Sequence, residues 1–417
     1  MVRSVRSFVI RVASTAVPLA VVGAQTTWLV GGGGLPDINA AMAVASPGDV
    51  VRVAPGIYPP FTVTKTVSIL PTATGGTWTI QAGGAPAPAM YVGATAVGTR
   101  TVTVVGMRTD YKSLLLPAVI VQNAPTTVVI DDLRVNYVTS LVNSQAPSAV
   151  YVENSQVWLR DAAIAPTVAG VVASTLYVAP PPIGGNDGLC GIYAIGSRLR
   201  VQNVLVFGFD AAGAYGGDAV RLDAGSSFYG DGVSITALAF DLRGGAGGVF
   251  GGNALHYVMP TSMPLSCSTI NPVGGAAPNP GGAYAINGDR GFIAPGVQRF
   301  VPSCLGVDAG FTNANTRNPA LGTTLNITTT ALVNRGYSLF LSFGATVGTN
   351  IPGIAQRSIV DLPTAVLIGS ATTPATIPLT VPNTATLLGV QYTLQGVLAP
   401  TANSGPAFTS GDAGVIG

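Results

Sequence analysis

Charge is scarce in this sequence. Only 9% of its 417 residues are Asp, Glu, Lys or Arg, against about 25% in a typical soluble domain. There is one glutamate, Glu153, and there are two lysines, Lys65 and Lys112. Helical bundles and coiled coils need charged outer faces, so this composition excludes them. A hydrophobic content of 48% and a mean hydropathy of +0.49 also exclude a disordered chain.

Histidine and cysteine are equally scarce. His256 is the single histidine, and the three cysteines show neither the CxxC nor the HxxxH spacing of a zinc site. Cys267 and Cys304 lie in a Gly/Pro-rich region, where a disulfide between them would stabilise the fold by about 4 kcal/mol. The sequence leaves its formation open. Cys190 precedes Ile192 by two positions, so on a strand we expect it to be a small buried hydrophobic residue.

The N-terminus has the pattern of a secretory signal peptide. Arg3, Arg6 and Arg11 precede the apolar residues 12–22, and small residues follow. We predict that residues 1–24 direct bacterial-type export to the cell surface or the medium, the alternative being a buried N-terminal strand. Their removal would change the formal charge from +2 to −1, which leaves no electrostatic footprint for nucleic acid. No later stretch has eighteen uninterrupted apolar residues, so we expect no transmembrane segment after signal removal.

Glycine, proline and short β runs dominate the rest of the chain, which contains 54 Gly and 31 Pro. A short strand is expected at residues 26–30. Asp37 is a plausible N-cap for one amphipathic helix, because apolar residues follow it at helical spacing up to Ala45. From residue 46 onward, alternating β runs are separated by turn residues, and no helical period returns.

A pattern of short strands then recurs between about residues 100 and 305. Its starts lie 31, 42, 28 and 35 residues apart, with loops of unequal length that end in Gly-Gly and a small or polar residue. Such periods predict coils stacked along one axis. We therefore predict a parallel β-helix over residues 25–305, capped by the N-terminal helix, with a β-sandwich array as the alternative. The starts are Ala118, Ala149, Gly191, Ala219 and Ala254.

Side-chain alternation on these strands predicts a column of large residues on the outside. If Val150, Ile192, Val220 and Leu255 point inward, then Tyr151, Tyr193, Arg221 and His256 point outward at the same place on successive coils. Tyrosine rings stack on sugar faces, and a guanidinium binds a carboxylate through two hydrogen bonds. The column is a candidate polysaccharide-binding face. The alternative is an ordinary solvated or loop-covered strand face.

Residues 46–70, with Ser-Pro-Gly-Asp-Val-Val and Pro-Gly-Ile-Tyr, resemble the opening coil of the pectate-lyase-like, right-handed parallel β-helix superfamily. The resemblance implies a fold more than an activity, because lyases, esterases and many exported proteins without known activity share it. A polygalacturonase-type hydrolase is disfavoured, since Asp131-Asp132 lacks an accompanying Gly-His-Gly turn and Arg-x-Lys. A pectinesterase is disfavoured because no Gln precedes an Asp.

A calcium-dependent polysaccharide lyase is harder to exclude. Asp218, Asp223 and Asp231 fall within one expected coil together with Arg221, and clustered carboxylates suit Ca²⁺. Hydrogen bonding at turns is the competing role for Asp218. The sequence on balance favours no cofactor and no catalysis.

The sequence changes character near residue 306. Residues 306–317 are predicted to be a linker, and residues 318–417 to form a small antiparallel β-sandwich, because runs of five or six strand residues alternate with turns. This part is similar to accessory C-terminal domains of exported bacterial proteins. Three classes of function remain open: an exported structural or polysaccharide-binding protein, a calcium-dependent lyase, and a self-assembling surface or filament protein.

Overall fold

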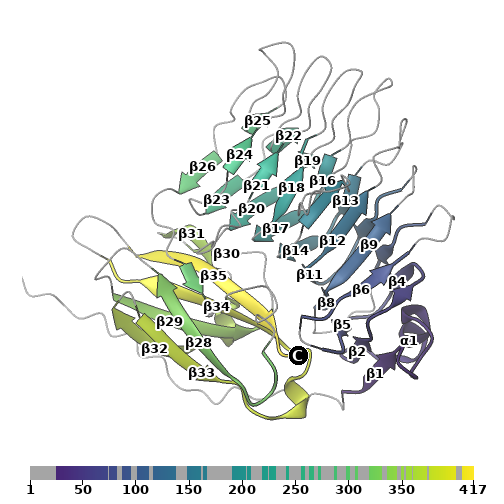
Figure 1. The fold of residues 1–417 in the computed structure, drawn as a ribbon. Coiled ribbons are helices and arrows are strands. Elements are labelled where there is room, and N and C mark those ends of the chain that lie inside the picture. The colour runs from purple at the N-terminus through teal and green to yellow at the C-terminus, as the bar shows by residue number, and fades with distance from the viewer. Residues whose placement is uncertain are drawn as a thin grey trace, which may run out of the picture.

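The computed structural model describes two bodies of β-structure that lie side by side (Figure 1). A solenoid of stacked strands is formed by the N-terminal part of the chain, and an antiparallel domain by the C-terminal part. The described residues are 25–73, 75–81, 87–94, 101–111, 116–137, 148–160, 163–166, 190–202, 204–207, 218–223, 225–231, 241–243, 255–258, 263–266, 271–273, 286–288, 297–300, 306–308, 319–330, 336–344, 349–351, 354–358, 360–372, 375–400 and 406–417. The predicted signal peptide, Cys267 and Cys304 lie outside them.

Three parallel sheets form the walls of the solenoid. Sheet A has ten described strands and sheets B and C have eight each. Sheet A contains β1 (Thr27–Val30), β2 (Val50–Val53), β5 (Ser68–Pro71), β8 (Val102–Val105), β11 (Val128–Asp131), β14 (Gln156–Arg160), β17 (Arg198–Gln202), β20 (Ser227–Asp231), β23 (Met263–Ser266) and β26 (Val297–Phe300).

Sheets B and C complete each coil. Sheet B contains β3 (Ile57–Tyr58), β6 (Trp78–Ile80), β9 (Met107–Tyr111), β12 (Arg134–Tyr137), β15 (Ala163–Pro166), β18 (Leu205–Phe207), β21 (Asp241–Arg243) and β24 (Asn271–Val273). Sheet C contains β4 (Phe61–Val63), β7 (Met90–Val92), β10 (Val119–Gln122), β13 (Ser148–Glu153), β16 (Cys190–Ile195), β19 (Val220–Asp223), β22 (Leu255–Val258) and β25 (Ile286–Gly288).

The chain visits the walls in a fixed order, from sheet C to sheet A to sheet B and back to sheet C one coil further on. Every strand pair within the three walls is parallel, for example Val119 with Val150 and Ile192 with Val220. This register is that of a parallel β-helix, so the predicted fold class is confirmed and the sandwich-array alternative is wrong.

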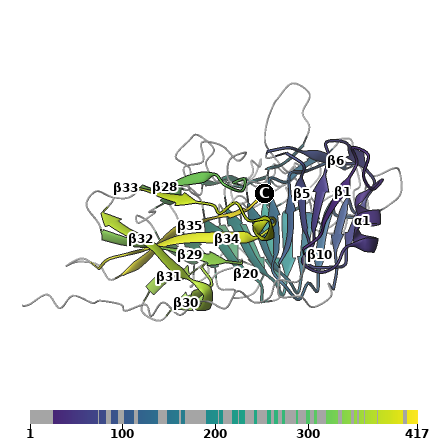
Figure 2. The same cartoon turned by 90° about the horizontal axis from the view of Figure 1, so that it is seen from below.

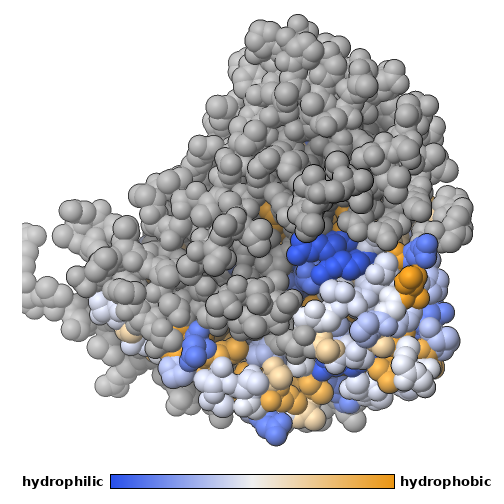
Figure 3. Space-filling view, viewed as in Figure 1, coloured by the Kyte–Doolittle hydropathy of each residue, from blue (hydrophilic) through white to orange (hydrophobic). Residues whose placement is uncertain are grey.

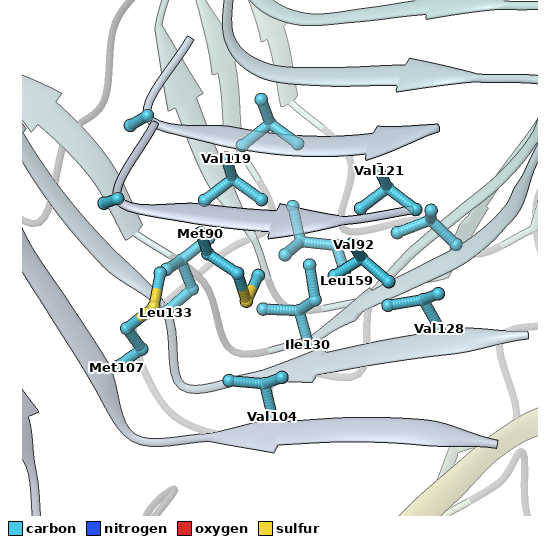
Figure 4. Close-up of a cluster of buried hydrophobic side chains, with 14 of the residues drawn as sticks. Met90, Val92, Val104, Met107, Val119, Val121, Val128, Ile130, Leu133 and Leu159 are labelled. Atoms are coloured by element: carbon cyan, nitrogen blue, oxygen red, sulfur yellow. The ribbon is translucent and has the colours of Figure 1, made fainter. Parts of the chain in front are cut away.

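The interior of the solenoid is one continuous apolar core. Val150, Ile192 and Val220 are completely buried and stack on successive coils, as the alternation predicts. Figure 4 shows the core of the middle coils, where side chains from all three walls meet. Each fully buried aliphatic side chain contributes roughly 1.5–3 kcal/mol relative to an exposed one, so stacking coils stabilises each of them.

The turn from sheet C to sheet A repeats with a specific chemistry. Asn154 and Gly196 have φ of 45° and 58°, a conformation that favours Asn and Gly. The serines that follow them form a buried ladder: Ser197 Oγ accepts from Ser155 N at 3.2 Å, and Ser226 Oγ accepts from Ser197 N at 3.2 Å. The ladder keeps the corners of successive coils in line.

A short helix covers the first coil, as predicted. Helix α1 (Ile38–Val44) begins at Asp37, whose carboxylate accepts a hydrogen bond from Ala40 N at 2.8 Å. Ile38, Ala41 and Met42 are its buried residues. The helix contacts β1, β2 and β4 and so shields that end of the apolar core (Figure 1).

The C-terminal domain is antiparallel, with one parallel pair. A seven-stranded sheet has the order β32, β29, β34, β35, β27, β28, β33. A Cβ on Gly369 in β32 would lie 2.9 Å from Ile377 Cδ1 in β33, so the sheet curls until its edge strands meet. Its elements are β27 (Gly306–Asp308), β28 (Thr324–Thr330), β29 (Gly336–Phe343), β32 (Val366–Thr372), β33 (Ala375–Thr380), β34 (Gln391–Leu398) and β35 (Ala407–Val415), beside the pair β30 (Thr349–Ile351) and β31 (Ile354–Ser358) and the 3-10 turns Leu362–Thr364 and Ala385–Leu387.

One detail of this domain differs from the sequence-based expectation. Gly306–Asp308 is strand β27 of the curled sheet, not linker, because its backbone pairs with β28. Three-residue strands carry too short a pattern to be recognised in sequence.

The C-terminal domain packs against the outside of sheet A (Figure 2). Ser68 Oγ donates to Gly389 O at 3.0 Å, and Gln391 Nε2 donates to Thr103 Oγ1. Val50, Leu70, Val105 and Val415 form an apolar cluster from both bodies.

On the face drawn in Figure 3, the strongly hydrophilic residues among those described lie in one compact patch and a few isolated spots, among pale and orange residues. Among the described residues, no helix has the length and apolar character needed to cross a membrane.

Candidate functional site

The outer face of sheet C carries the column that the sequence predicts. Tyr151 lies opposite Tyr193, Tyr193 opposite Arg221, and Arg221 opposite His256, on four consecutive strands in one register. All four side chains are partly exposed. The geometry of the predicted column is therefore present.

Tyr193, Arg221 and Asp223 form the centre of the site. Tyr193 Oη donates to Asp223 Oδ2 at 2.6 Å, and Arg221 Nε donates to Asp223 Oδ1 at 3.4 Å. The Arg221 guanidinium carbon lies 5.6 Å from the centre of the Tyr193 ring, within the range of a cation–π contact. Burial, together with the Asp223 carboxylate, raises the pKa of Tyr193, so this phenol stays protonated.

His256 is held by Asp218. The distance from His256 Nδ1 to Asp218 Oδ2 is 2.6 Å, although Asp218 lies before β19 and His256 lies one coil further on in β22. Burial by itself lowers the pKa of His256, but the hydrogen bond and the charge of Asp218 outweigh burial and raise it. A carboxylate on Nδ1 directs the opposite ring nitrogen, Nε2, away from itself, as in catalytic His–Asp pairs.

A second hydrogen-bonded group continues the site toward the N-terminal coils. Tyr151 Oη donates to Glu153 Oε2 at 3.3 Å, and Gln122 Nε2 donates to the same oxygen at 2.6 Å. Tyr91 Oη donates to Gln122 Oε1 at 3.1 Å. Burial is the main reason that the pKa of Tyr151 is raised to about 12, with a smaller contribution from Glu153.

The rings of Tyr151 and Tyr193 do not form a flat platform. Their centroids are 5.8 Å apart and their planes are inclined by 63°, an edge-to-face contact. A ligand therefore meets ring edges, hydroxyl groups and the faces that remain accessible, in place of two coplanar surfaces.

The charged side chains of the site are partly covered. The exposed fractions of the side chains are 20% for Arg221, 18% for His256, 16% for Asp223 and 8% for Asp218. Among the described residues, no hydrogen-bond partner contacts the two terminal nitrogens of Arg221 or Nε2 of His256. These nitrogen atoms are the groups with hydrogen-bonding capacity for a ligand.

The three aspartates proposed as calcium ligands do not come together. Asp231 lies in β20 of sheet A, opposite Gln202, whereas Asp218 and Asp223 lie at sheet C. Asp218 and Asp223 are engaged by His256, Tyr193 and Arg221. No group of three His, Cys, Asp or Glu side chains suited to a metal ion occurs in the described part of the chain. These residues do not fit Ca²⁺, which takes six to eight oxygen ligands.

Cys190 is completely buried at the start of β16, as the sequence suggests. Burial raises the pKa of its thiol well above the usual value, so it is a weak nucleophile. The proposed disulfide partners Cys267 and Cys304 lie outside the described residues.

Asp131 and Asp132 both form ion pairs with arginine side chains. Asp131 makes a buried salt bridge with Arg160 on the next coil. Asp132 binds Arg108 at 2.8 Å and Arg134 at 3.5 Å. Each carboxylate is thus paired with arginine.

Sequence reasoning missed several members of the site. Glu153, Gln122 and Tyr91 follow from the same alternation, since Gln122 and Glu153 lie opposite each other in the row next to the column and Tyr91 lies in the column itself. The hydrogen bond between Asp218 and His256 has no such signal, because the two residues are 38 positions apart.

Comparison with known proteins gives a distant likeness. No protein-family model matches this chain, and no curated protein matches it. A solved structure that is similar over 88% of this chain, at 10% identity and a TM-score of 0.21, is WceF of Pantoea stewartii, described as a glycan biofilm modifying enzyme with a bacteriophage tailspike-like parallel β-helix fold. The match spans 51% of that protein, so this chain corresponds to about half its length.

Proposed function

We propose that this protein is exported and binds an acidic polysaccharide on the outer face of sheet C. The observation that supports the proposal is the shared register of Tyr151, Tyr193, Arg221 and His256 on consecutive strands. Strands in a sheet are about 4.8 Å apart, so a linear polymer that crosses them meets one of these side chains on each coil.

Arg221 is the residue expected to select an acidic polymer. Its Nε atom is tied to Asp223, while its terminal nitrogens have no partner among the described residues. They are the donors that bind a carboxylate most strongly. Asp223 offsets the positive charge of Arg221, so recognition depends on short contacts rather than on long-range attraction.

Substitution in the column tests the proposal. Tyr193→Ala combined with Arg221→Ala removes one stacking surface and the carboxylate contact, so we expect loss of at least tenfold in affinity for polygalacturonate or alginate. Retardation in native gels that contain the polymer measures the affinity. Arg198→Ala, at an exposed arginine of sheet A, is the matched control and should bind as the parent does.

The same gels define specificity. A neutral glucan lacks the carboxylate, and a nucleic acid lacks the sugar faces at the spacing of the column, so neither should retard the protein. Unchanged retardation of the double variant by polygalacturonate and alginate would refute the assignment of this face.

Export is tested separately. The proposal predicts that a bacterial host expressing the full chain releases or displays a form that begins at or near Gln25, since Val22, Gly23 and Ala24 form a small-residue cleavage pattern. N-terminal sequencing of the exported form identifies the cleavage site. A chain that stays in the cytoplasm with residues 1–24 attached would contradict export.

A further inference from the structure

We propose that the face that binds the polymer also cleaves it, by metal-independent β-elimination at a uronate residue. In this reaction Arg221 binds the carboxylate, His256 removes the neighbouring proton and Tyr193 protonates the leaving oxygen. The inference rests on the proposed function and adds to it a substrate class and a reaction.

The order of these three side chains matches the order of the reacting groups. Tyr193, Arg221 and His256 lie on three consecutive strands of sheet C at equivalent positions. In a uronate the carboxyl group is attached to C5, which also carries the acidic proton, and the leaving oxygen is on the adjacent C4. In the proposed complex, a carboxylate on Arg221 has C5 on the side of His256 and the C4 oxygen on the side of Tyr193.

His256 has the arrangement of an oriented base. Asp218 holds Nδ1 at 2.6 Å, which fixes the ring and stabilises the imidazolium that forms when Nε2 takes a proton. The side chain of Asp218 is only 8% exposed, so water weakens its electrostatic interaction with His256 little. Asp218 is a positioning residue in this account, since it acts through His256.

The acid is on the other side of Arg221. Tyr193 is protonated, and when no substrate is bound its O–H group donates a hydrogen bond to Asp223 Oδ2 at 2.6 Å. Rotation about the C–O bond of the phenol turns the O–H toward a glycosidic oxygen. Asp223 also binds Arg221, so one carboxylate positions both the proton donor and the carboxylate-binding group.

The elimination balances within the site. His256 Nε2 takes the proton from C5, and the electrons of that C–H bond form the C4=C5 double bond. The C4–O4 bond breaks, and O4 receives the proton of Tyr193. Transfer of a proton from His256 to Tyr193 through water restores both groups, and no oxidant or reductant is consumed. The guanidinium of Arg221 stabilises the charge that develops on the carboxylate, the role that a calcium ion would otherwise have.

The test measures product formation and binding on the same samples. Purified protein is incubated with polygalacturonate, and separately with alginate, in the presence of a chelator, and the ultraviolet absorbance of the unsaturated uronate product is followed. We expect product with the parent and with Arg198→Ala. His256→Gln should lower the rate by about 10²–10⁴-fold, as for loss of an acid–base group, while retardation in polymer gels falls far less than it does for the Tyr193→Ala, Arg221→Ala double variant.

Tyr193→Phe is the second variant, since it keeps the ring and removes only the proton donor. It should lose the elimination by a similar factor while it still binds the polymer. Asp218→Asn should lower kcat with little change in KM, because it leaves the Arg221 contact intact. Normal near-ultraviolet circular dichroism of each variant verifies folding.

The outcomes separate the inference from the proposed function. Binding of the polymer without product from the parent overturns the elimination and leaves the binding function standing. A parent that neither binds nor cleaves overturns both. Product that disappears with the chelator, or that persists at the parental rate in His256→Gln and Tyr193→Phe, also overturns the assignment of these residues.

Discussion

Replacing Val119 with aspartate should unfold the solenoid, whereas the same change at the adjacent Ile120 should leave it folded. Val119 is completely buried in the core between Met90 and Val150. An aspartate there removes an apolar side chain and buries an unpaired carboxyl group. We expect a loss of more than about 5 kcal/mol, the range reserved for substitutions of this kind.

Ile120 is the matched control. It is also β-branched and lies in the same strand, but it is half-buried on the outer face between Tyr91 and Tyr151. Ile120→Asp leaves the carboxylate in contact with water, so we expect a cost of about 1 kcal/mol. Urea denaturation followed by circular dichroism measures both. Equal losses at the two positions would contradict the alternation of inward and outward side chains in β10.

The second large effect is expected at the contact between the two bodies. Gly389 has φ of 72°, and a Cβ at this position would lie 2.8 Å from Val50 Cγ2 and 3.1 Å from Ser68 Cβ. Gly389→Ala therefore carries the cost of a left-handed backbone, about 1–2 kcal/mol, and a further cost of about 1–3 kcal/mol for overpacking against sheet A. We expect the total to appear as a lower Tm and as faster proteolysis between the two bodies.

Gly322 separates the two costs. Its φ is 75°, but a Cβ there would meet nothing closer than Asn383 Cβ at 3.6 Å, which is ordinary contact. Gly322→Ala should therefore show the backbone cost alone. If the two variants lose the same stability, the packing of Gly389 against Val50 and Ser68 does not contribute, and the interface described for the C-terminal domain is wrong.

The architecture and the column were predictable because both depend on local alternation. Val150 and Tyr151 point to opposite sides, and the same pair of residue types recurs as Ile192 and Tyr193 on the next coil. A period of two fixes which residues share a face, and stacking of equivalent strands then fixes their register. The cap helix was predictable for a similar reason, because Asp37 and the apolar spacing after it are adjacent in sequence.

The contacts that give the site its chemistry were harder to predict from the sequence. The distance between Asp218 and His256 depends on how the turn before β19 aligns with β22, and no periodic pattern encodes that alignment. The placement of Asp231 on another wall follows from where each coil turns its corner, which loops of unequal length obscure. Gly389 and Ser68 are 321 residues apart, and their contact has no local signal.

The serine ladder is an intermediate case. Asn154-Ser155, Gly196-Ser197 and Gly225-Ser226 carry a recognisable motif of a left-handed residue followed by serine. These residue pairs therefore mark the corners between sheets C and A in the sequence.

The proposed elimination requires that Tyr193, Arg221 and His256 act on one sugar residue. A crystal structure of His256→Gln with a bound oligouronate tests this claim most directly. We predict a uronate carboxylate on the terminal nitrogens of Arg221, with C5 facing position 256 and the glycosidic oxygen within hydrogen-bonding distance of Tyr193 Oη. An oligosaccharide bound to another wall, or with its carboxylates directed away from Arg221, would contradict it.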